Sequence, residues 1–193
     1  MSCKWLPELM PCTNWAEFSS YEETIYQVFS SDFITTQPEF EKKPVNIRRH
    51  PLVGNREQAF FHVTSKEYTT QTERCPDPKR CERIRWIRAF IENYACDPAN
   101  CEGCSGIKVW AEPFKMYTRV HILSEEENYM VIVERRETYN LLITAYYFDY
   151  PHALEKQLKK YEAYVEYSAR DCAARPLKLS IHSGGIEHAC RRR

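Results

Sequence analysis

Residues 129–150 contain two strand-like runs joined by a short polar turn at Arg136-Glu137-Thr138. The second run is almost wholly apolar and aromatic and carries Thr144 as its aliphatic hydroxyl. Two earlier segments, 107–112 and 117–124, alternate apolar and polar residues with a period of two. Four successive strands with short links predict an antiparallel meander.

Helical patterns flank these strands in the sequence. Residues 14–32 place apolar side chains at helical spacing, and Asn14 with Glu17 resembles a capping arrangement. Residues 78–94 open with a proline and carry isoleucines on one face, and residues 151–169 return to a helical period. The chain is therefore predicted to be α+β, with N-terminal helices, a four-stranded antiparallel sheet and a C-terminal helix.

The remaining segments are predicted to be short or extended. Residues 37–54 contain three prolines and read as an extended connection, with a short edge strand at 44–47. The apolar stretch Ala59–Val63 reads as a strand. Residues 97–106, rich in Cys, Gly and Asn, read as a loop.

Length and composition favour one globular domain. The chain has 193 residues, of which 43% are apolar. We expect an N-terminal segment at 1–13, one domain at 14–170 with a cysteine-rich insertion around 96–104, and a basic, disordered tail at 171–193.

Charge and hydropathy exclude several classes of protein. No apolar run approaches the roughly 18 residues that a membrane-spanning helix needs, and the first twelve residues lack the apolar region of a signal peptide. We therefore expect a cytoplasmic protein with no membrane partner. The formal net charge of zero argues against a nucleic-acid coat protein, but a local basic cleft remains open.

An isolated histidine, a basic helix and a hydroxyl-bearing strand suggest cleavage of RNA without a metal ion. That reaction uses the neighbouring 2′-hydroxyl as nucleophile, so the enzyme must move protons and stabilise charge on the phosphorane. Histidine suits the proton transfer, since its ordinary pKa is about 6.5. Arginine binds phosphate in a bidentate manner, and a Thr or Tyr hydroxyl can donate a further hydrogen bond. On the last strand, Thr144 is predicted to share a face with Leu142, Tyr146 and Phe148.

Each of these residues also has a structural interpretation. His62 lies in an aromatic segment, where a lone histidine is often structural. Thr144 could satisfy a cross-strand contact. The basic side chains of residues 80–88 could form a solvated helix face paired with Glu82 and Glu92.

Nine cysteines form a second candidate site. The odd number disfavours a complete disulfide framework. Cys101 and Cys104 have the spacing of a zinc-ligand pair, and Cys96 with Cys75 or Cys81 could complete a four-thiolate structural site. Free thiols in a surface loop are the alternative. No cofactor is expected for catalysis.

A series of segments resembles the PBECR type, which phages and mobile elements carry within the barnase/EndoU/colicin/RelE-like nuclease superfamily. The segments are Phe18, Ile25-Tyr26, Phe29, Asp32-Phe33, Phe60-Phe61-His62-Val63-Thr64-Ser65, Arg83-Ile84-Arg85-Trp86-Ile87, Ile91-Glu92-Asn93, Glu125-Glu126-Glu127-Asn128-Tyr129 and Leu142-Ile143-Thr144-Ala145-Tyr146-Tyr147. The resemblance runs from about residue 14 to about residue 165, and it implies an α+β domain that cleaves RNA.

The resemblance also assigns roles to residues. It implies His62 as the acid or base, Arg83 or Arg85 as the phosphate ligand, and Thr144 and Tyr146 as a hydroxyl pair. Four further polar residues are expected to bind substrate: Lys66, Arg119, His121 and Arg136.

Three functions follow as hypotheses. The first is a metal-independent endoribonuclease that leaves 2′,3′-cyclic phosphate ends, acting as a toxin or effector with an immunity or antitoxin protein as partner. The second is an inactive, zinc-stabilised module that binds nucleic acid or protein. The third is a small regulatory or structural protein of a mobile element.

Overall fold

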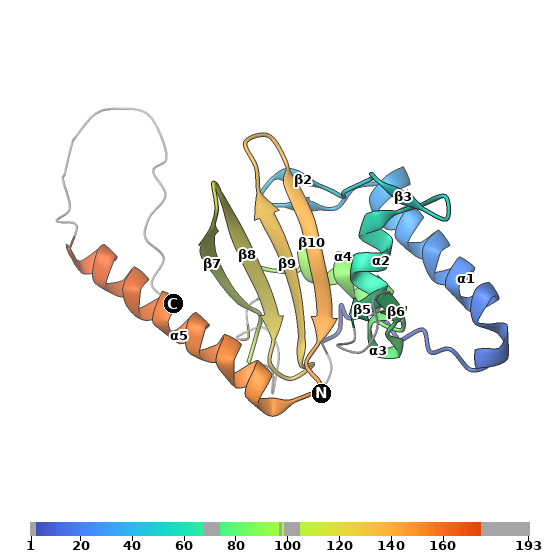
Figure 1. Ribbon diagram of the computed structural model, residues 1–193. Helices are drawn as coiled ribbons and strands as arrows, with labels where there is room; N and C mark the ends of the chain where they lie inside the picture. Colours follow the sequence, from blue (N-terminus) through green and yellow to red (C-terminus); the bar gives the residue numbers. More distant parts are fainter. Residues whose placement is uncertain (1–2, 68–73, 97, 99–104, 175–193) are drawn as a thin grey trace.

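The main sheet of the computed structural model has six strands in the order β1-β2-β10-β9-β8-β7 (Figure 1). The structure describes residues 3–67, 74–96, 98 and 105–174. The six strands are β1 (Glu39–Phe40), β2 (Lys43–Asn46), β7 (Lys108–Phe114), β8 (Tyr117–Ser124), β9 (Tyr129–Arg135) and β10 (Asn140–Tyr147). Two small hairpins pair β3 (Leu52–Val53) with β4 (Arg56–Glu57) and β5 (Ser65–Glu67) with β6 (Arg74–Pro76).

The α+β class is confirmed, but the predicted four-stranded antiparallel sheet is wrong. Strands β7 to β10 do form an antiparallel meander. The sheet then continues, because β2 pairs with β10 in parallel, through Asn140 opposite Val45. The strand predicted at residues 44–47 is therefore internal, and the edge belongs to β1. Buried Asn140 fastens this junction by donating from Nδ2 to the Phe40 carbonyl at 2.8 Å.

Helices pack on both faces of the sheet. A 3-10 turn (Trp15–Glu17), α1 (Phe18–Ser30) and a π-helical turn (Ser31–Thr35) come first, followed by α2 (Gln58–Thr64), α3 (Pro78–Cys81) and α4 (Ile84–Glu92). Helices α1, α2 and α4 share the larger core with one face, while α5 (Pro151–Ala174) covers part of the other (Figure 1). The N-terminal segment belongs to this domain, since Trp86 Nε1 donates to the Pro7 carbonyl at 2.8 Å.

Two predicted elements have a different form. The strand predicted at Ala59–Val63 is the helix α2. Its buried residues are Ala59, Phe60, Val63 and Thr64, which is the spacing of a helix face rather than the alternation of a strand. The helix predicted at 78–94 is broken between α3 and α4, where Arg83 leaves helical geometry with φ −101° and ψ 18°.

A β-bulge changes the faces of β10. The pairing with β9 shifts between Leu142 and Thr144, so one extra residue enters β10. Leu142 then packs in the larger core, whereas Tyr146 and Phe148 pack with α5 on the opposite face. The prediction that Leu142 and Tyr146 share a face is therefore wrong.

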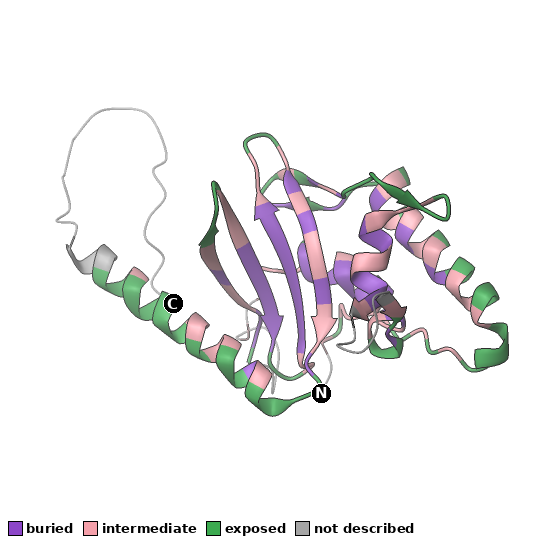
Figure 2. Ribbon diagram, in the orientation of Figure 1, coloured by how far each residue is buried: buried purple, intermediate pink, exposed green. Residues whose placement is uncertain are grey.

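Burial divides α5 into two halves (Figure 2). Leu154 is buried against the sheet, and Leu158 and Tyr161 are partly buried beside it, whereas Val165 and Tyr167 are exposed. Helix α5 extends beyond the predicted boundary at residue 170, and the rest of the predicted tail, 175–193, lies outside the described residues. Among the described residues, no helix combines the length and apolar character needed to cross a lipid bilayer.

Candidate active site

A cavity of about 370 Å³ opens between α2, α3 and the β10 face of the sheet, and we call it the His62 cavity. It is lined by Arg48, Ala59, His62, Arg80, Arg119, Leu141, Leu142, Ile143, Thr144 and Tyr146. One histidine, three arginines and two hydroxyl side chains therefore meet there. They come from α2, α3, β8, β10 and the segment after β2, which lie far apart in the sequence.

The His62 carbonyl fixes the C-terminal turn of α2 to its neighbours. It accepts a hydrogen bond from Arg80 Nη1 at 3.1 Å and a longer one from Thr144 Oγ1 at 3.4 Å. Arg80 Nη1 also donates to the Ser65 carbonyl at 3.1 Å. These bonds join α2, α3 and β10 at the wall of the cavity, so His62, Arg80 and Thr144 are held in one place.

Tyr146 provides a hydroxyl that remains protonated. Burial raises the pKa of its phenol to about 12, with the nearby Arg80 opposing and Glu112 adding to that rise. The guanidinium carbon of Arg80 lies 5.6 Å from the Tyr146 ring centroid. Tyr146 can therefore donate a hydrogen bond at neutral pH, and Arg80 can stabilise negative charge beside it.

Arg119 is held in the cavity wall by a buried carboxylate. Its Nε lies 3.3 Å from Oε2 of Glu134, whose side chain is almost fully buried. The other oxygen of Glu134 pairs with Arg136. This carboxylate therefore orients two arginines at the same end of the sheet.

Two cavity arginines were not singled out from the sequence. Arg48 belongs to the exposed Arg48-Arg49 pair, which was assigned to an extended connection. Arg80 lies in the basic helix that the sequence offers for phosphate chemistry, with a solvated helix face as the alternative, and it has no individual role there. The residue Asp77 could indicate from the sequence where this helix begins, because aspartate is a preferred N-cap residue. In the structure it caps α3 by accepting a hydrogen bond from the Arg80 backbone amide at 3.1 Å.

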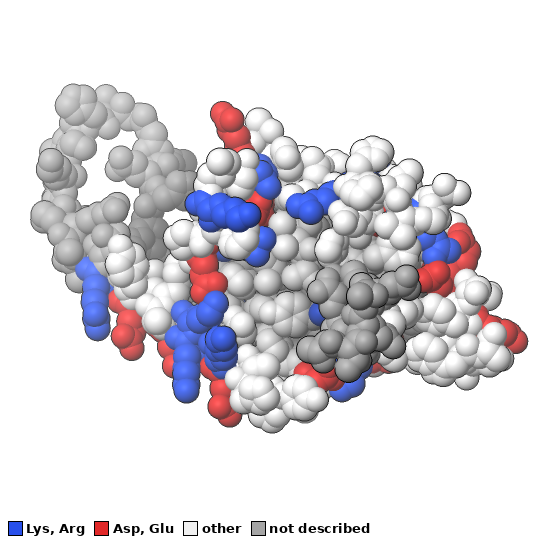
Figure 3. Space-filling model, viewed as in Figure 1, with Lys and Arg blue, Asp and Glu red and all other residues white. Residues whose placement is uncertain are grey.

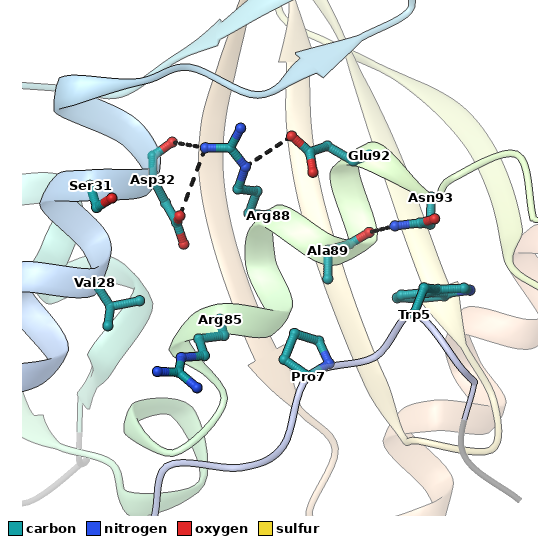
Figure 4. A pocket seen from close by; sticks show the side chains of 10 residues that line it. All are labelled: Trp5, Pro7, Val28, Ser31, Asp32, Arg85, Arg88, Ala89, Glu92 and Asn93. Carbon is teal, nitrogen blue, oxygen red and sulfur yellow. Dashed lines mark hydrogen bonds and ion pairs between the residues drawn. The ribbon is translucent and has the colours of Figure 1, made fainter.

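Arg83 and Arg85, the expected phosphate ligands, are not among the residues that line the His62 cavity. Arg83 donates to the Lys79 carbonyl at 2.9 Å and lies over the Tyr147 ring. Arg85 lines a separate pocket between the N-terminal segment, α1 and α4 (Figure 4). Arg85 is exposed on α4, whose isoleucines face the core.

The second pocket carries both signs of charge. Arg88 lies between Asp32 and Glu92, with Nη1 3.7 Å from Asp32 Oδ1 and Nε 2.9 Å from Glu92 Oε1 (Figure 4). Burial raises the pKa of Asp32, and Arg88 opposes that rise. This pairing neutralises much of the charge there, so the pocket is a poorer phosphate site than the His62 cavity.

Three predicted substrate-binding residues have structural partners outside the cavity lining. Lys66 pairs with Asp77 at 2.7 Å. His121 is buried and stacks on Trp110 with ring centroids 4.7 Å apart, and burial lowers its pKa to about 4. Arg136 lies 3.4 Å above the Tyr117 ring centroid. Arg119 is the one member of the predicted group that lines the cavity.

Basic side chains gather over the upper part of the sheet in the view of Figure 3. The formal net charge of the chain is zero. Several arginines of β8 and β9 and of the turn after β9 pair with carboxylates close by: Arg119 and Arg136 with Glu134, and Arg135 with Glu41. A local basic surface attracts a polyanion even when the molecule as a whole is neutral.

Some of the predicted zinc ligands lie within the described residues and others lie outside them. Cys81 is buried, its thiol donates to the Thr64 carbonyl at 3.3 Å, and burial raises its pKa to about 12. Cys96 Sγ accepts from Trp5 Nε1 at 3.4 Å. Cys101 and Cys104 lie outside the described residues. Within the described ranges, no group of three or more His, Cys, Asp or Glu side chains could hold a metal ion.

Comparison with known proteins does not identify a family for this chain. No protein-family model, curated protein or solved structure matches this chain. The resemblance to the PBECR type therefore rests on the residue series alone. The chemistry of the His62 cavity carries the functional argument.

Proposed function

We propose that the protein is a metal-independent endoribonuclease whose active site is the His62 cavity. The observation that carries the proposal is the meeting of His62, Tyr146 and three arginines in one cavity of about 370 Å³. A proton acceptor, a hydroxyl donor and several fixed positive charges are what cleavage by the 2′-hydroxyl of RNA requires.

The reaction can be written with these groups alone. His62 takes the proton of the 2′-hydroxyl, and the 2′-oxygen forms a bond to phosphorus. The bond from phosphorus to the 5′-oxygen breaks, and the leaving oxygen takes the proton of the Tyr146 phenol. Proton transfer from His62 back to Tyr146 through water restores both groups. The products are a 2′,3′-cyclic phosphate and a free 5′-hydroxyl.

The arginines have distinct parts in this scheme. Arg48 and Arg119 reach the cavity from opposite sides of β10, from the segment after β2 and from β8. Both can bind the phosphate oxygens, where a charge-assisted hydrogen bond is strongest. Arg80 holds the His62 turn and, beside Tyr146, stabilises the phenolate that forms when the proton leaves.

The test is incubation of the purified protein with mixed RNA in the presence of EDTA, followed by analysis of the ends formed. His62→Ala should lower the cleavage rate by about 100-fold or more, since it removes the proton acceptor. Arg48→Ala or Arg119→Ala should each lower it by about 10- to 100-fold, as expected for loss of one charged hydrogen bond.

Arg85→Ala is the matched control. Arg85 is an exposed arginine that lies outside the cavity, so its loss should leave cleavage near the wild-type rate. Circular dichroism checks that each variant is folded. If the folded wild type cleaves no RNA, the proposal is wrong and a binding module becomes the better account. Equal losses in Arg85→Ala and Arg119→Ala would exclude the His62 cavity as the site.

A further inference from the structure

The sheet surface beyond the His62 cavity carries aromatic rings covered by arginines. Arg119, which lines the cavity, also lies over the ring of Phe114, with its guanidinium carbon 3.4 Å from the ring centroid. Phe114 is the last residue of β7 and stands opposite Tyr117, the first residue of β8. Arg119 therefore links the cavity to the tip of this hairpin.

The two rings and two arginines form one arrangement, which we call the hairpin platform: Phe114, Tyr117, Arg119 and Arg136. Arg136 lies over Tyr117 as Arg119 lies over Phe114, each at 3.4 Å. Glu134, on the neighbouring strand β9, pairs with both arginines. One buried carboxylate thus holds both guanidinium groups over the rings.

The platform remains accessible to a ligand. Phe114 is 37% exposed, and Met116 at the turn is 82% exposed. Helix α5 packs on the same sheet face lower down, around Trp110 and Met130, and leaves the hairpin end uncovered. Phe114 is exposed and Tyr117 is half-buried. Accessible aromatic rings next to fixed guanidinium groups are suited to stacking nucleobases, while the charges attract the backbone phosphates.

We propose that the hairpin platform is a base-binding subsite that stacks a nucleobase of single-stranded RNA beside the phosphate in the His62 cavity. The inference rests on the proposed function and adds a determinant of substrate choice. Arg119 connects the two sites, because it lines the cavity and its guanidinium also lies over the Phe114 ring. Stacking on such a platform needs an unpaired base, so duplex RNA should be a poor ligand.

Binding of an uncleavable RNA analogue tests the subsite separately from catalysis. The probe is a single-stranded 2′-O-methyl oligonucleotide that carries 2-aminopurine, whose fluorescence falls on stacking. Without a 2′-hydroxyl, the probe cannot undergo the proposed cleavage. Phe114→Ala and Tyr117→Ala should each weaken its binding by about 10-fold or more and restore its fluorescence, as expected for loss of one base stack.

Two controls separate stacking from other effects. Tyr167→Ala removes a 71% exposed aromatic side chain from α5 and should leave binding unchanged. An abasic residue at the stacked position should weaken binding to the wild type but have no further effect on Phe114→Ala. If the protein binds the probe and Arg48→Ala weakens binding, while both hairpin variants stay within about two-fold of the wild type, the subsite is excluded but the proposed function stands. Absence of binding to any RNA would overturn both.

Discussion

At the scale of single residues, burial decides which ionisable groups can take part in chemistry. Tyr146 lines the cavity with a phenol whose pKa is raised to about 12, so it can donate a proton but is not ionised at rest. His121 is buried under α5 and has its pKa lowered to about 4 by that burial, although Glu112 opposes the shift. His62 and His121 are both expected from the sequence to act on RNA, but only His62 lines the cavity, whereas His121 is buried outside it.

His121 should make stability depend on pH between about 4 and 6.5. Its pKa in the folded protein, about 4, lies below the ordinary value of 6.5, so the unfolded chain binds more protons in this range. Stability is unaffected by this group above pH 6.5 and falls as pH decreases towards 4. The loss should reach about 3 kcal/mol, measured by urea unfolding at several pH values.

The variant His121→Phe isolates this contribution. Phenylalanine keeps a ring to stack on Trp110 but cannot titrate, so the fall in stability below pH 6.5 should be smaller than in the wild type. His152→Gln replaces an exposed histidine and should preserve the wild-type pH dependence. Identical pH curves for the wild type and His121→Phe would show that His121 is not held neutral by the fold.

At the scale of elements, short segments place the functional side chains. The helix α2 is seven residues long, and its turn presents His62 to the cavity while Phe60 and Val63 anchor it in the core. The bulge in β10 lets Leu142 pack inward while Thr144 and Tyr146 remain at the cavity.

The two halves of α5 should differ in their contribution to stability. Leu154→Ala should lower the free energy of unfolding by about 2–3 kcal/mol, because Leu154 is 9% exposed and packs with Met130 and Phe148. Val165→Ala, on the same helix but 45% exposed, should change it by less than about 0.5 kcal/mol. Denaturant unfolding measures both. Equal effects would mean that the second half of α5 is also packed in solution.

At the scale of the whole molecule, the fold assembles the cavity from distant parts of the chain. Arg48 and Tyr146 line the same cavity although almost one hundred residues separate them in sequence. The parallel pairing of β2 with β10 brings the segment after β2 to the cavity. The cavity therefore depends on the pairing of β2 with β10, which is part of the main sheet.

Metal content should affect stability without affecting the chemistry. We expect Cys96, Cys101 and Cys104, with Cys75, to bind one structural zinc ion. Chelation should lower the melting temperature, while RNA cleavage by the still-folded protein should continue. Cys104→Ser should reduce the zinc content, measured by elemental analysis, whereas Cys81→Ala should not, because Cys81 is a buried thiol. A wild-type content below about a tenth of an equivalent would contradict the prediction.

The sequence by itself determined the meander of β7 to β10, the long C-terminal helix and the α+β class, because these depend on local periodicity. It also picked out His62, Thr144 and Tyr146, which the structure places in one cavity. Their catalytic roles, the RNA substrate and the zinc site remain predictions.

Only the tertiary structure decided the parallel strand β2, the helical form of α2 and which arginines reach the cavity. Short segments such as Ala59–Val63 fit either a helix or a strand locally, and packing of Phe60 and Val63 in the core selects the helix. Arg80 of α3 lines the His62 cavity, whereas Arg85 of α4 lines the separate pocket beside the N-terminal segment. Such choices depend on contacts between residues far apart in the chain, which local patterns do not encode.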